Sequence, residues 1–443
     1  MLQYYCVQGH NNTSKGVQQI MQRKTLYSRN FILFLIGQII SVFGNQILRY
    51  AIPLYLLNQT GSSALLGTIS AVAFIPMLVL YPIGGIIADQ FNKKNIMIIL
   101  DFSTAILIII FCLLEGTINI IPLIAIVMLF LYGIQGVDQP AVKASVSALV
   151  SPEHMMKANS IVDVINSLAS MMGPVIGGIL FSVFGLTPVL YTSIVFFFGA
   201  VIVEIFTVIP FEKKQRKGTM LTAGVVDLKE SFEFLFQKQS MLLKVSLVYA
   251  SANILLTSLV LIGAPVLITQ YLGFTVDAAN RLYGYSQGVI AAGAVLGGLL
   301  AGLLSKKLNS KTSSFLLIGC SMSIFIVGIA LQMFSNSMAI YLVMVVGFGL
   351  LVALSTLFQI QIMTWIQILT PKDLIGKVIS CVICINMCAN PIGQLVYGII
   401  FEHIGNFTYL PFYAAPIMMI CISVFTRPMF GRIDNQIKEQ IKD

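Results

Sequence analysis

Charged residues are scarce in this sequence, and their scarcity decides its class. Only 10% of the 443 residues are Asp, Glu, Lys or Arg, whereas 57% are hydrophobic. A soluble chain of this composition would have far too little polar surface to face water. The composition therefore excludes a water-soluble enzyme or binding module, and the bulk of the protein must face lipid.

Residue patterns for metal binding, disulfides and nucleotide hydrolysis are also missing. The three histidines are isolated in loops or tails, and the seven cysteines lie mostly in apolar segments. Cys381, Cys384 and Cys388 share a helix face, but no acid or histidine accompanies them. No Gly-x-x-x-x-Gly-Lys-Ser/Thr sequence is present. We therefore expect no metal site, no disulfide framework and no cofactor, so that energy must come from a gradient or another subunit.

Apolar segments long enough to cross a bilayer recur along the whole chain. Because a span needs about 20 apolar residues, they predict an all-α, polytopic membrane protein with twelve transmembrane helices. The first segment lacks the cleavage site of a signal peptide, so we expect it to be retained. The expected spans are residues 30–57, 64–88, 95–115, 120–147, 157–184, 187–210, 241–271, 281–304, 312–334, 338–368, 374–401 and 408–427.

The positions of the basic residues predict the orientation of the spans. Lys and Arg occupy the N-terminal tail, alternate connections and the C-terminal tail, whereas the connections between them carry none, apart from Arg281. Because basic loops stay in the cytosol, we expect both termini to be cytoplasmic in a multi-pass protein of the cell membrane. The net charge of +9 then reflects topology and does not indicate nucleic-acid binding.

A repeated pattern divides the chain into two related halves. The residues Gly84-Gly85 and Lys93-Lys94 return as Gly297-Gly298 and Lys306-Lys307, 213 positions later. We expect a cytoplasmic N-terminal tail (residues 1–29), an N-terminal six-helix bundle (30–210), a cytoplasmic linker (211–240), a C-terminal six-helix bundle (241–427) and a cytoplasmic C-terminal tail (428–443). Residues 225–236 of the linker predict an amphipathic helix that rests on the membrane interface or binds a partner. Parallel six-helix repeats are typical of transporters whose site forms between two rocking halves.

A stripe of polar residues in the first span predicts part of a cavity. Gln38, Ser41, Asn45 and Arg49 lie on one helix face. Arg49 is in the outer half of the span, where it serves the cavity, forms a structural ion pair or snorkels to the interface. The C-terminal half offers uncharged polar groups, and we name Asn253, Gln359 and Asn386 as further cavity candidates.

Carboxyl groups within spans are candidates for proton coupling. Asp163 lies about 9 Å into the fifth span, on a face that continues as small residues, and Asp138 lies in the fourth. A carboxyl whose surroundings alternate between wet and closed would bind and release a proton. We expect Asp163 to be the carrier before Asp138, for which an ion pair with Lys143 is the alternative, and we interpret Asp101 and Glu204 as structural.

Two motifs resemble the major facilitator superfamily, in particular its drug-efflux branch with macrolide and siderophore exporters. Gly85-x-x-x-Asp89-x-x-x-Lys93-Lys94 is similar to the loop motif of that family, with Gln90 and Asn92 as departures. Gly173-Pro174-Val-Ile-Gly177-Gly178 resembles its antiporter motif. The resemblance implies that Asp89 and the lysines close the cytoplasmic side, and that the glycines act in gating; plain anchoring of the lysines and ordinary helix packing are the alternatives.

One departure from the family pattern affects the coupling scheme. Tyr132-Gly-Ile-Gln135-Gly136 stands where Arg-x-x-Gln-Gly is usual, so a scheme that uses that arginine does not carry over.

These observations favour a secondary active transporter that exports a small amphiphilic compound in exchange for protons. Its expected partners are a small-molecule substrate, protons and the bilayer, with no nucleic acid, and we expect a monomer. An uptake permease, a lipid flippase on the same fold and a membrane receptor without flux remain alternatives. A membrane prenyltransferase would need paired Asp-rich motifs, and the sequence has none.

Overall fold

The computed structural model describes residues 28–211, 240–304, 310–371 and 374–442, and within these ranges every regular element is a helix. Twelve of the described helical segments are long and apolar enough to cross a membrane, which confirms the predicted all-α fold with twelve spans. The amphipathic linker helix expected at residues 225–236 and most of the expected N-terminal tail lie outside the described residues.

The first half contains six long helices. They are α2 (Arg29–Thr60), α3 (Ser63–Gln90), α4 (Lys93–Leu114), α5 (Ile120–Leu149), α6 (Met155–Phe184) and α7 (Leu186–Phe206), with the short η1 (Pro152–His154) before α6. Side chains that accept backbone N–H groups start several of them, as Ser62 does for α3 and Asn92 for α4. Gly61 ends α2 in the left-handed conformation, with φ of 63°. The sixth span ends at Phe206, four residues earlier than predicted.

The second half begins with a span that contains two π-helical turns. It consists of α9 (Ser240–Ala252), η3 (Asn253–Thr257), α10 (Ser258–Val266) and η4 (Leu267–Tyr271). The remaining helices are α11 (Val276–Leu304), α12 (Ser310–Met333), α13 (Ser337–Leu369), α14 (Ile375–His403) and α15 (Pro411–Lys442). Because α15 continues to Lys442, the segment expected as a C-terminal tail from residue 428 extends the last helix.

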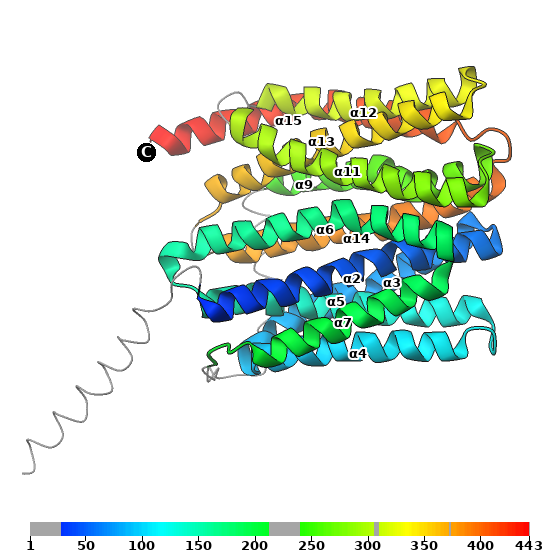
Figure 1. Ribbon diagram of the computed structural model, residues 1–443. Helices are drawn as coiled ribbons and strands as arrows, with labels where there is room; N and C mark the ends of the chain where they lie inside the picture. Colours follow the sequence, from blue (N-terminus) through cyan, green and yellow to red (C-terminus); the bar gives the residue numbers. More distant parts are fainter. Residues whose placement is uncertain (1–27, 212–239, 305–309, 372–373, 443) are drawn as a thin grey trace, which may run out of the picture.

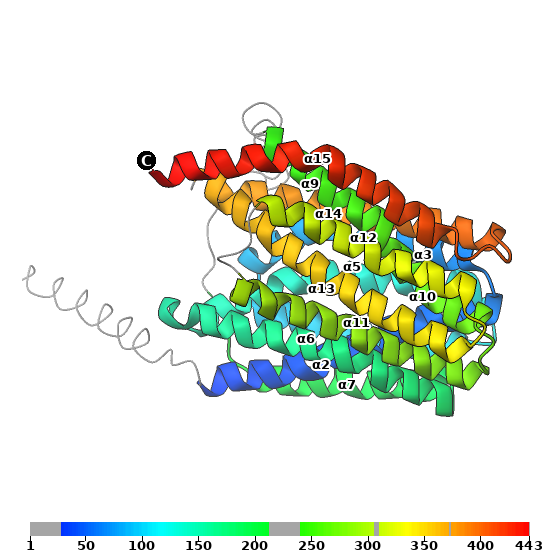
Figure 2. The same cartoon turned by 90° about the horizontal axis from the view of Figure 1, so that it is seen from above.

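The helices run side by side, and the described N- and C-terminal residues lie at the same end of the molecule (Figures 1 and 2). We call this end, which carries Arg29, Lys93, Lys94 and Lys157, the basic end. The other end, which carries Gly61, Glu115, Gly185 and Gly273, is the opposite end. An even number of spans places both described termini on one side, in agreement with the alternation of basic connections.

The repeated glycines have the same packing role in both halves. A Cβ on Gly84 would lie 2.7 Å from the Cα of Val137 on α5, and one on Gly297 would lie 2.4 Å from the carbonyl oxygen of Ala353 on α13. The second glycine of each pair, Gly85 or Gly298, has no such neighbour within 4 Å. The first glycine therefore lets α3 approach α5, and α11 approach α13, as the sequence repeat predicts.

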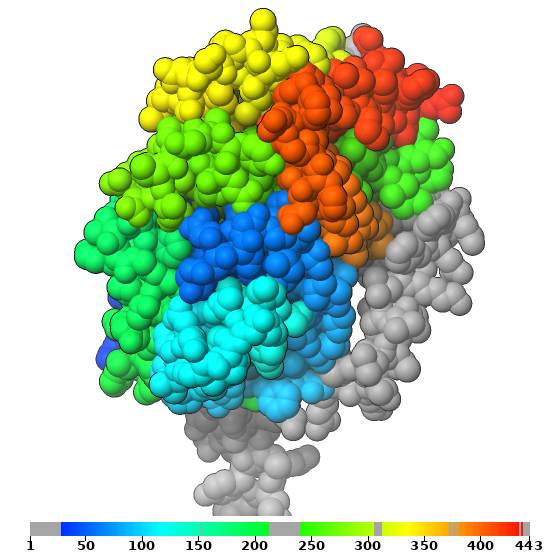
Figure 3. Space-filling model, turned by 90° about the vertical axis from the view of Figure 1, so that its right-hand side faces the viewer, coloured from blue at the N-terminus to red at the C-terminus, as the bar shows by residue number. Residues whose placement is uncertain are grey.

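The halves are joined at the opposite end, where α3 meets α14 and α6 meets α11. Gly67 and Gly398 bring the backbones of α3 and α14 so close that a Cβ on Gly67 would lie 2.8 Å from the Cα of Gly398. Gly178 and Gly284 do the same for α6 and α11, with 3.1 Å from the Cβ position of either to the Cα of the other. Figure 3 views this end and shows the blue N-terminal segment packed against the orange and green segments of the C-terminal half.

Hydrogen bonds reinforce this junction. The amide of Asn58 donates to the Asn280 side chain at 2.9 Å, and the hydroxyl of Tyr50 donates to the Asn280 carbonyl. The Glu402 carboxylate accepts from the Ser62 hydroxyl at 3.0 Å and from the backbone N–H of Ala64 at 3.1 Å. The remaining bonds are from Ser63 Oγ to the Gly398 carbonyl at 3.0 Å and from Gln270 Nε2 to the Gly61 carbonyl at 2.9 Å. The opposite end is therefore closed.

Candidate functional site

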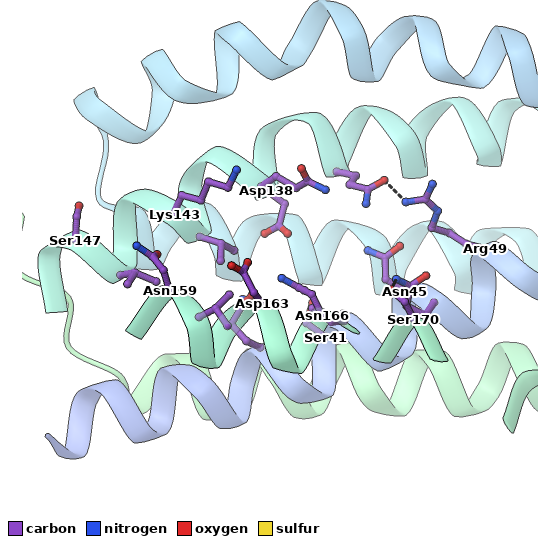
Figure 4. A pocket seen from close by; sticks show the side chains of 18 of the residues that line it. Ser41, Asn45, Arg49, Asp138, Lys143, Ser147, Asn159, Asp163, Asn166 and Ser170 are labelled. Carbon is purple, nitrogen blue, oxygen red and sulfur yellow. Dashed lines mark hydrogen bonds between the residues drawn. The ribbon is translucent and has the colours of Figure 1, made fainter. Parts of the chain in front are cut away.

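A polar cavity of about 780 Å³ lies within the N-terminal half, between α2, α5 and α6. Figure 4 shows side chains of these three helices pointing into it. Its lining consists mainly of amide, hydroxyl and charged side chains: Gln38, Ser41, Val42, Asn45, Gln46 and Arg49 from α2; Gln135, Asp138, Gln139, Val142, Lys143, Val146 and Ser147 from α5; Met155, Asn159, Val162, Asp163, Asn166 and Ser170 from α6. The predicted stripe of the first span thus lines one wall.

The cavity extends from the middle of the helices towards the basic end. Ser147 and Met155, which line its outer part, belong to the last turn of α5 and the first turn of α6. Asn159, Asp163 and Asn166 of α6 are exposed there, whereas Gly173, Gly177 and Gly178 on the same helix are buried. One face of α6 is thus packed near the opposite end and open near the basic end, which is the geometry of an alternating-access transporter with one side closed.

Arg49 occupies the inner end of the cavity. Its guanidinium carbon lies 4.5 Å from the centre of the Tyr132 ring, and the group donates a hydrogen bond to Gln135. Tyr132 stands where the resemblance would place an arginine, so α2 supplies at this point the cation that α5 lacks. A cation over an aromatic face is favourable, and no carboxylate pairs with Arg49 among the described residues. The arrangement agrees with the predicted cavity role of Arg49.

The candidates from the C-terminal half lie elsewhere. Asn253 and Asn386 are buried, and each donates to a carbonyl of its own helical segment, at 3.2 Å to Tyr249 and 2.8 Å to Val382. Gln359 is exposed on α13. None of the three lines the cavity in this conformation, because the cavity is enclosed by helices of the N-terminal half alone. Their binding role stays a prediction for other conformations.

The two predicted coupling carboxyls, Asp138 and Asp163, face each other across the cavity (Figure 4). The alternative ion pair between Asp138 and Lys143 is wrong for this conformation, since no such pair forms among the described residues, although both side chains line the cavity. The coupling role of Asp163 and Asp138 stays a prediction.

Two further carboxyls lie beside the cavity, and the sequence did not bring them together. Asp101 of α4 and Glu204 of α7 are 6% and 2% exposed, respectively. The hydroxyl of Ser41, a cavity residue, donates to Asp101 at 2.8 Å. The available signal was their position as acids in apolar segments, because such groups are costly in a membrane and rarely lack a function.

The loop-motif residues lie at the basic end. Lys94 donates to the carbonyl of Ile205 at 2.6 Å, and Lys93 lies over the Phe211 ring at 5.6 Å, so both lysines tie α4 to the segment after the sixth span. Asp89 is half-buried and forms no hydrogen bond or ion pair in the part of the chain that the structure describes. Gly85 has open space beside it. A closing role of this motif stays a prediction for a conformation in which the basic end is shut.

The antiporter-like motif lies at the meeting point of three helices. A Cβ on Gly173 would lie 2.6 Å from Gln46 Cβ, and one on Gly177 would lie 3.2 Å from the Tyr50 ring. The carbonyl of Pro174 and the backbone of Gly178 face Gly284 across the halves. These residues therefore combine packing within the N-terminal half with packing between the halves, and their part in gating stays a prediction.

Two six-helix repeats, a polar cavity among them and one closed end define the class of secondary transporters. The sequence model of the Major Facilitator Superfamily matches residues 34–393, and the chain belongs to this superfamily. It is therefore a multi-pass membrane transporter.

Several relatives share this architecture at low identity. The chain is 24% identical to the uncharacterized MFS-type transporter YfiS of Bacillus subtilis, covering 90% of this chain and 92% of the relative. It is 24% identical to macrolide efflux protein A of Streptococcus pyogenes (93% and 98% covered), and 25% identical to the enterobactin exporter EntS of Shigella flexneri (82% and 83%).

Solved structures agree on the fold. A POT family transporter in complex with 5-aminolevulinic acid superposes with a TM-score of 0.71 at 13% identity, covering 93% of this chain and 98% of that one. A mutant of the nucleoside transporter NupG gives 0.70 at 12% identity, covering 91% and 100%. At these identities the likeness concerns the fold alone.

Proposed function

We propose that this transporter exports a small amphiphilic compound in exchange for protons, from the cytoplasm across the cell membrane. The observation that carries the proposal is the cavity, which is large enough for a small molecule and opens towards the basic end, the end that the positive-inside rule assigns to the cytoplasm. A cavity that faces the cytoplasm while the other end is closed is ready to load a compound for export.

The substrate class rests on the lining and on the relatives. Amide and hydroxyl groups together with Arg49 favour a compound with several polar groups. The names of two relatives, a macrolide efflux protein and an enterobactin exporter, favour drug-like or siderophore compounds. Proton exchange rests on Asp138 and Asp163, whose carboxyls line the cavity.

The test is transport in everted membrane vesicles, in which the cytoplasmic face is outside. Vesicles containing the chain should accumulate erythromycin or enterobactin when respiration acidifies their interior, and a protonophore should abolish the accumulation. Vesicles with the Arg49→Ala variant, expressed to the same level, serve as the matched control and should accumulate less.

The same vesicles distinguish the alternatives. Accumulation only in right-side-out vesicles would identify an uptake permease, and transfer of a fluorescent phospholipid between leaflets would identify a flippase. Saturable binding without accumulation inside the vesicles would identify a receptor and contradict the proposal.

A further inference from the structure

Asp101 and Glu204 form a pair of buried carboxyls that lies behind the cavity wall. The pair joins α4 and α7, whereas the cavity lies between α2, α5 and α6. The side chain of Glu204 rests against α2 at Gly37, where an added Cβ would lie 3.2 Å from Glu204 Cγ. The absence of a side chain at Gly37 therefore leaves the space that Glu204 occupies.

The pair lacks the hydrogen bonds that ionised carboxylates require in a buried site. Neither carboxyl oxygen of Glu204 has a hydrogen-bond partner within the described structure, and Asp101 has one, from Ser41 to Oδ1, while its Oδ2 has none. Burying an ionised carboxylate is expensive unless it is paired with a cation or satisfied by several donors. Two such groups side by side would also repel each other. A bound proton removes both costs.

No cation of the described residues neutralises the pair. Lys94 lies on the same small pocket wall as Glu204, but its ammonium group donates to the carbonyl of Ile205. The charged group that does act on both carboxyls is a third acid, Asp138 of α5. The other charged residues on the neighbouring helices form no hydrogen bond or ion pair with either carboxyl in the part of the chain that the structure covers: Arg29 and Arg49 on α2, Asp89 on α3, Lys143 on α5, and Lys157 and Asp163 on α6.

A route for protons to the cavity is present. Ser41 lines the cavity and at the same time donates to Asp101, so its hydroxyl spans the wall between the two sites. Asp138 also lines the cavity and acts electrostatically on the pair. A hydroxyl is both donor and acceptor, and it can therefore pass a proton between a carboxyl and cavity water.

We propose that Asp101 and Glu204 form a buried proton-binding pair, which exchanges its proton with the cavity through Ser41 and Asp138. The proton binds to one carboxyl oxygen as the cavity closes and leaves when water reaches Ser41. This assignment rests on the proposed proton-coupled transport, and it adds a proton site that lies outside the substrate cavity.

Infrared spectroscopy tests the pair without any substrate. Purified protein in lipid nanodiscs is stepped between acidic and alkaline buffer, and the carbonyl-stretch band of protonated carboxyls is recorded. Glu204→Gln and Asp101→Asn should each lose part of this band. Glu115→Gln, which changes an acid directly after α4 at the opposite end, should keep it. Because Gln has the size of a protonated Glu, the variant should fold; if it does not, Ser41→Ala should slow the appearance of the band after the pH step.

A transport measurement connects the pair to coupling. In proteoliposomes, Glu204→Gln should lose accumulation of erythromycin driven by a pH gradient but keep exchange of erythromycin for erythromycin, which needs no net proton movement. An unchanged carboxyl band in both pair variants would overturn the proton site, as would a band displaced by sodium and not by pH. If the wild-type protein moves no erythromycin, the proposed function fails for this compound, and the infrared result still decides the site.

Discussion

At the inner end of the cavity, the guanidinium of Arg49 lies over Tyr132 and binds Gln135 without a carboxylate partner in the described structure. Its cation is therefore available to a substrate. Sequence reasoning placed this residue correctly because one helix face is fixed by spacing alone. It did not place Asn253, Gln359 or Asn386, because the rotation of a helix against its neighbours is decided by packing.

We expect Arg49→Ala to weaken substrate binding and Arg49→Lys to restore part of it, because lysine keeps the charge but loses the planar, forked donor geometry. The measurement is the concentration dependence of erythromycin transport in proteoliposomes. Equal apparent affinity in the wild-type protein and both variants would assign Arg49 to structure.

Asp163 and Asp138 differ in surroundings, since Asp163 is exposed and Asp138 is half-buried between the cavity and the acid pair. Both Asp163→Asn and Asp138→Asn should reduce accumulation driven by a pH gradient, because each removes a carboxyl that can alternate between wet and closed surroundings. Transport assayed at matched protein levels checks this. Full accumulation in the Asp163 variant would move the carrier role to Asp138 or to the pair behind it.

At the scale of helices, the small-residue faces of α6 and α11 were predicted to meet, and only part of them does. Gly178 and Gly284 pack across the halves, whereas Gly298 and Gly302 have open space beside them. The sequence pattern gives the face of a helix but not the conformation, and a contact present in one state of a transporter is absent in the other. The same limit applies to Asp101 and Glu204, whose proximity depends on the packing of α4 against α7.

We expect Gly67→Ala to prevent full closure of the opposite end, because its Cβ would lie 2.4 Å from the carbonyl oxygen of Gln394 and 2.8 Å from Gly398 Cα. Backbone atoms cannot move aside as flexible side chains do. A cysteine at Ala279, which is 1% exposed, reports the change in a background without the seven native cysteines. Its alkylation by a membrane-impermeant maleimide should accelerate. Gly431→Ala, a helical glycine with nothing within 4 Å, is the matched control, and equal rates for both would contradict the prediction.

For the whole molecule, composition and repeats predicted the twelve spans, the two halves and the common side of the termini. They could not indicate which end is closed, since that depends on contacts between residues more than 200 positions apart, such as Asn58 and Asn280. Nor could they show that the cavity of this conformation belongs to one half.

Asp89 connects the two conformations. It has no partner in the described structure while the basic end is open, and the family motif implies a partner when that end closes. Asp89→Asn should therefore leave expression and substrate binding from the cytoplasmic side intact but slow turnover. Single-turnover and steady-state transport rates separate these effects, and a normal turnover rate in a well-expressed variant would remove the closing role.

The junction at the opposite end also sets how often the empty protein opens there. Six hydrogen bonds join the halves at this end. At about 0.5–1.5 kcal/mol each, they favour closure by roughly 3–9 kcal/mol. Since about 1.4 kcal/mol is a factor of ten, fewer than about 1 in 100 empty molecules would be open to the other side. A micromolar ligand binds with about 8 kcal/mol in total, so only a ligand with very different affinities for the two states can reverse this preference. The unloaded carrier thus leaks little, because its closed end is stable until cargo or protons change the balance.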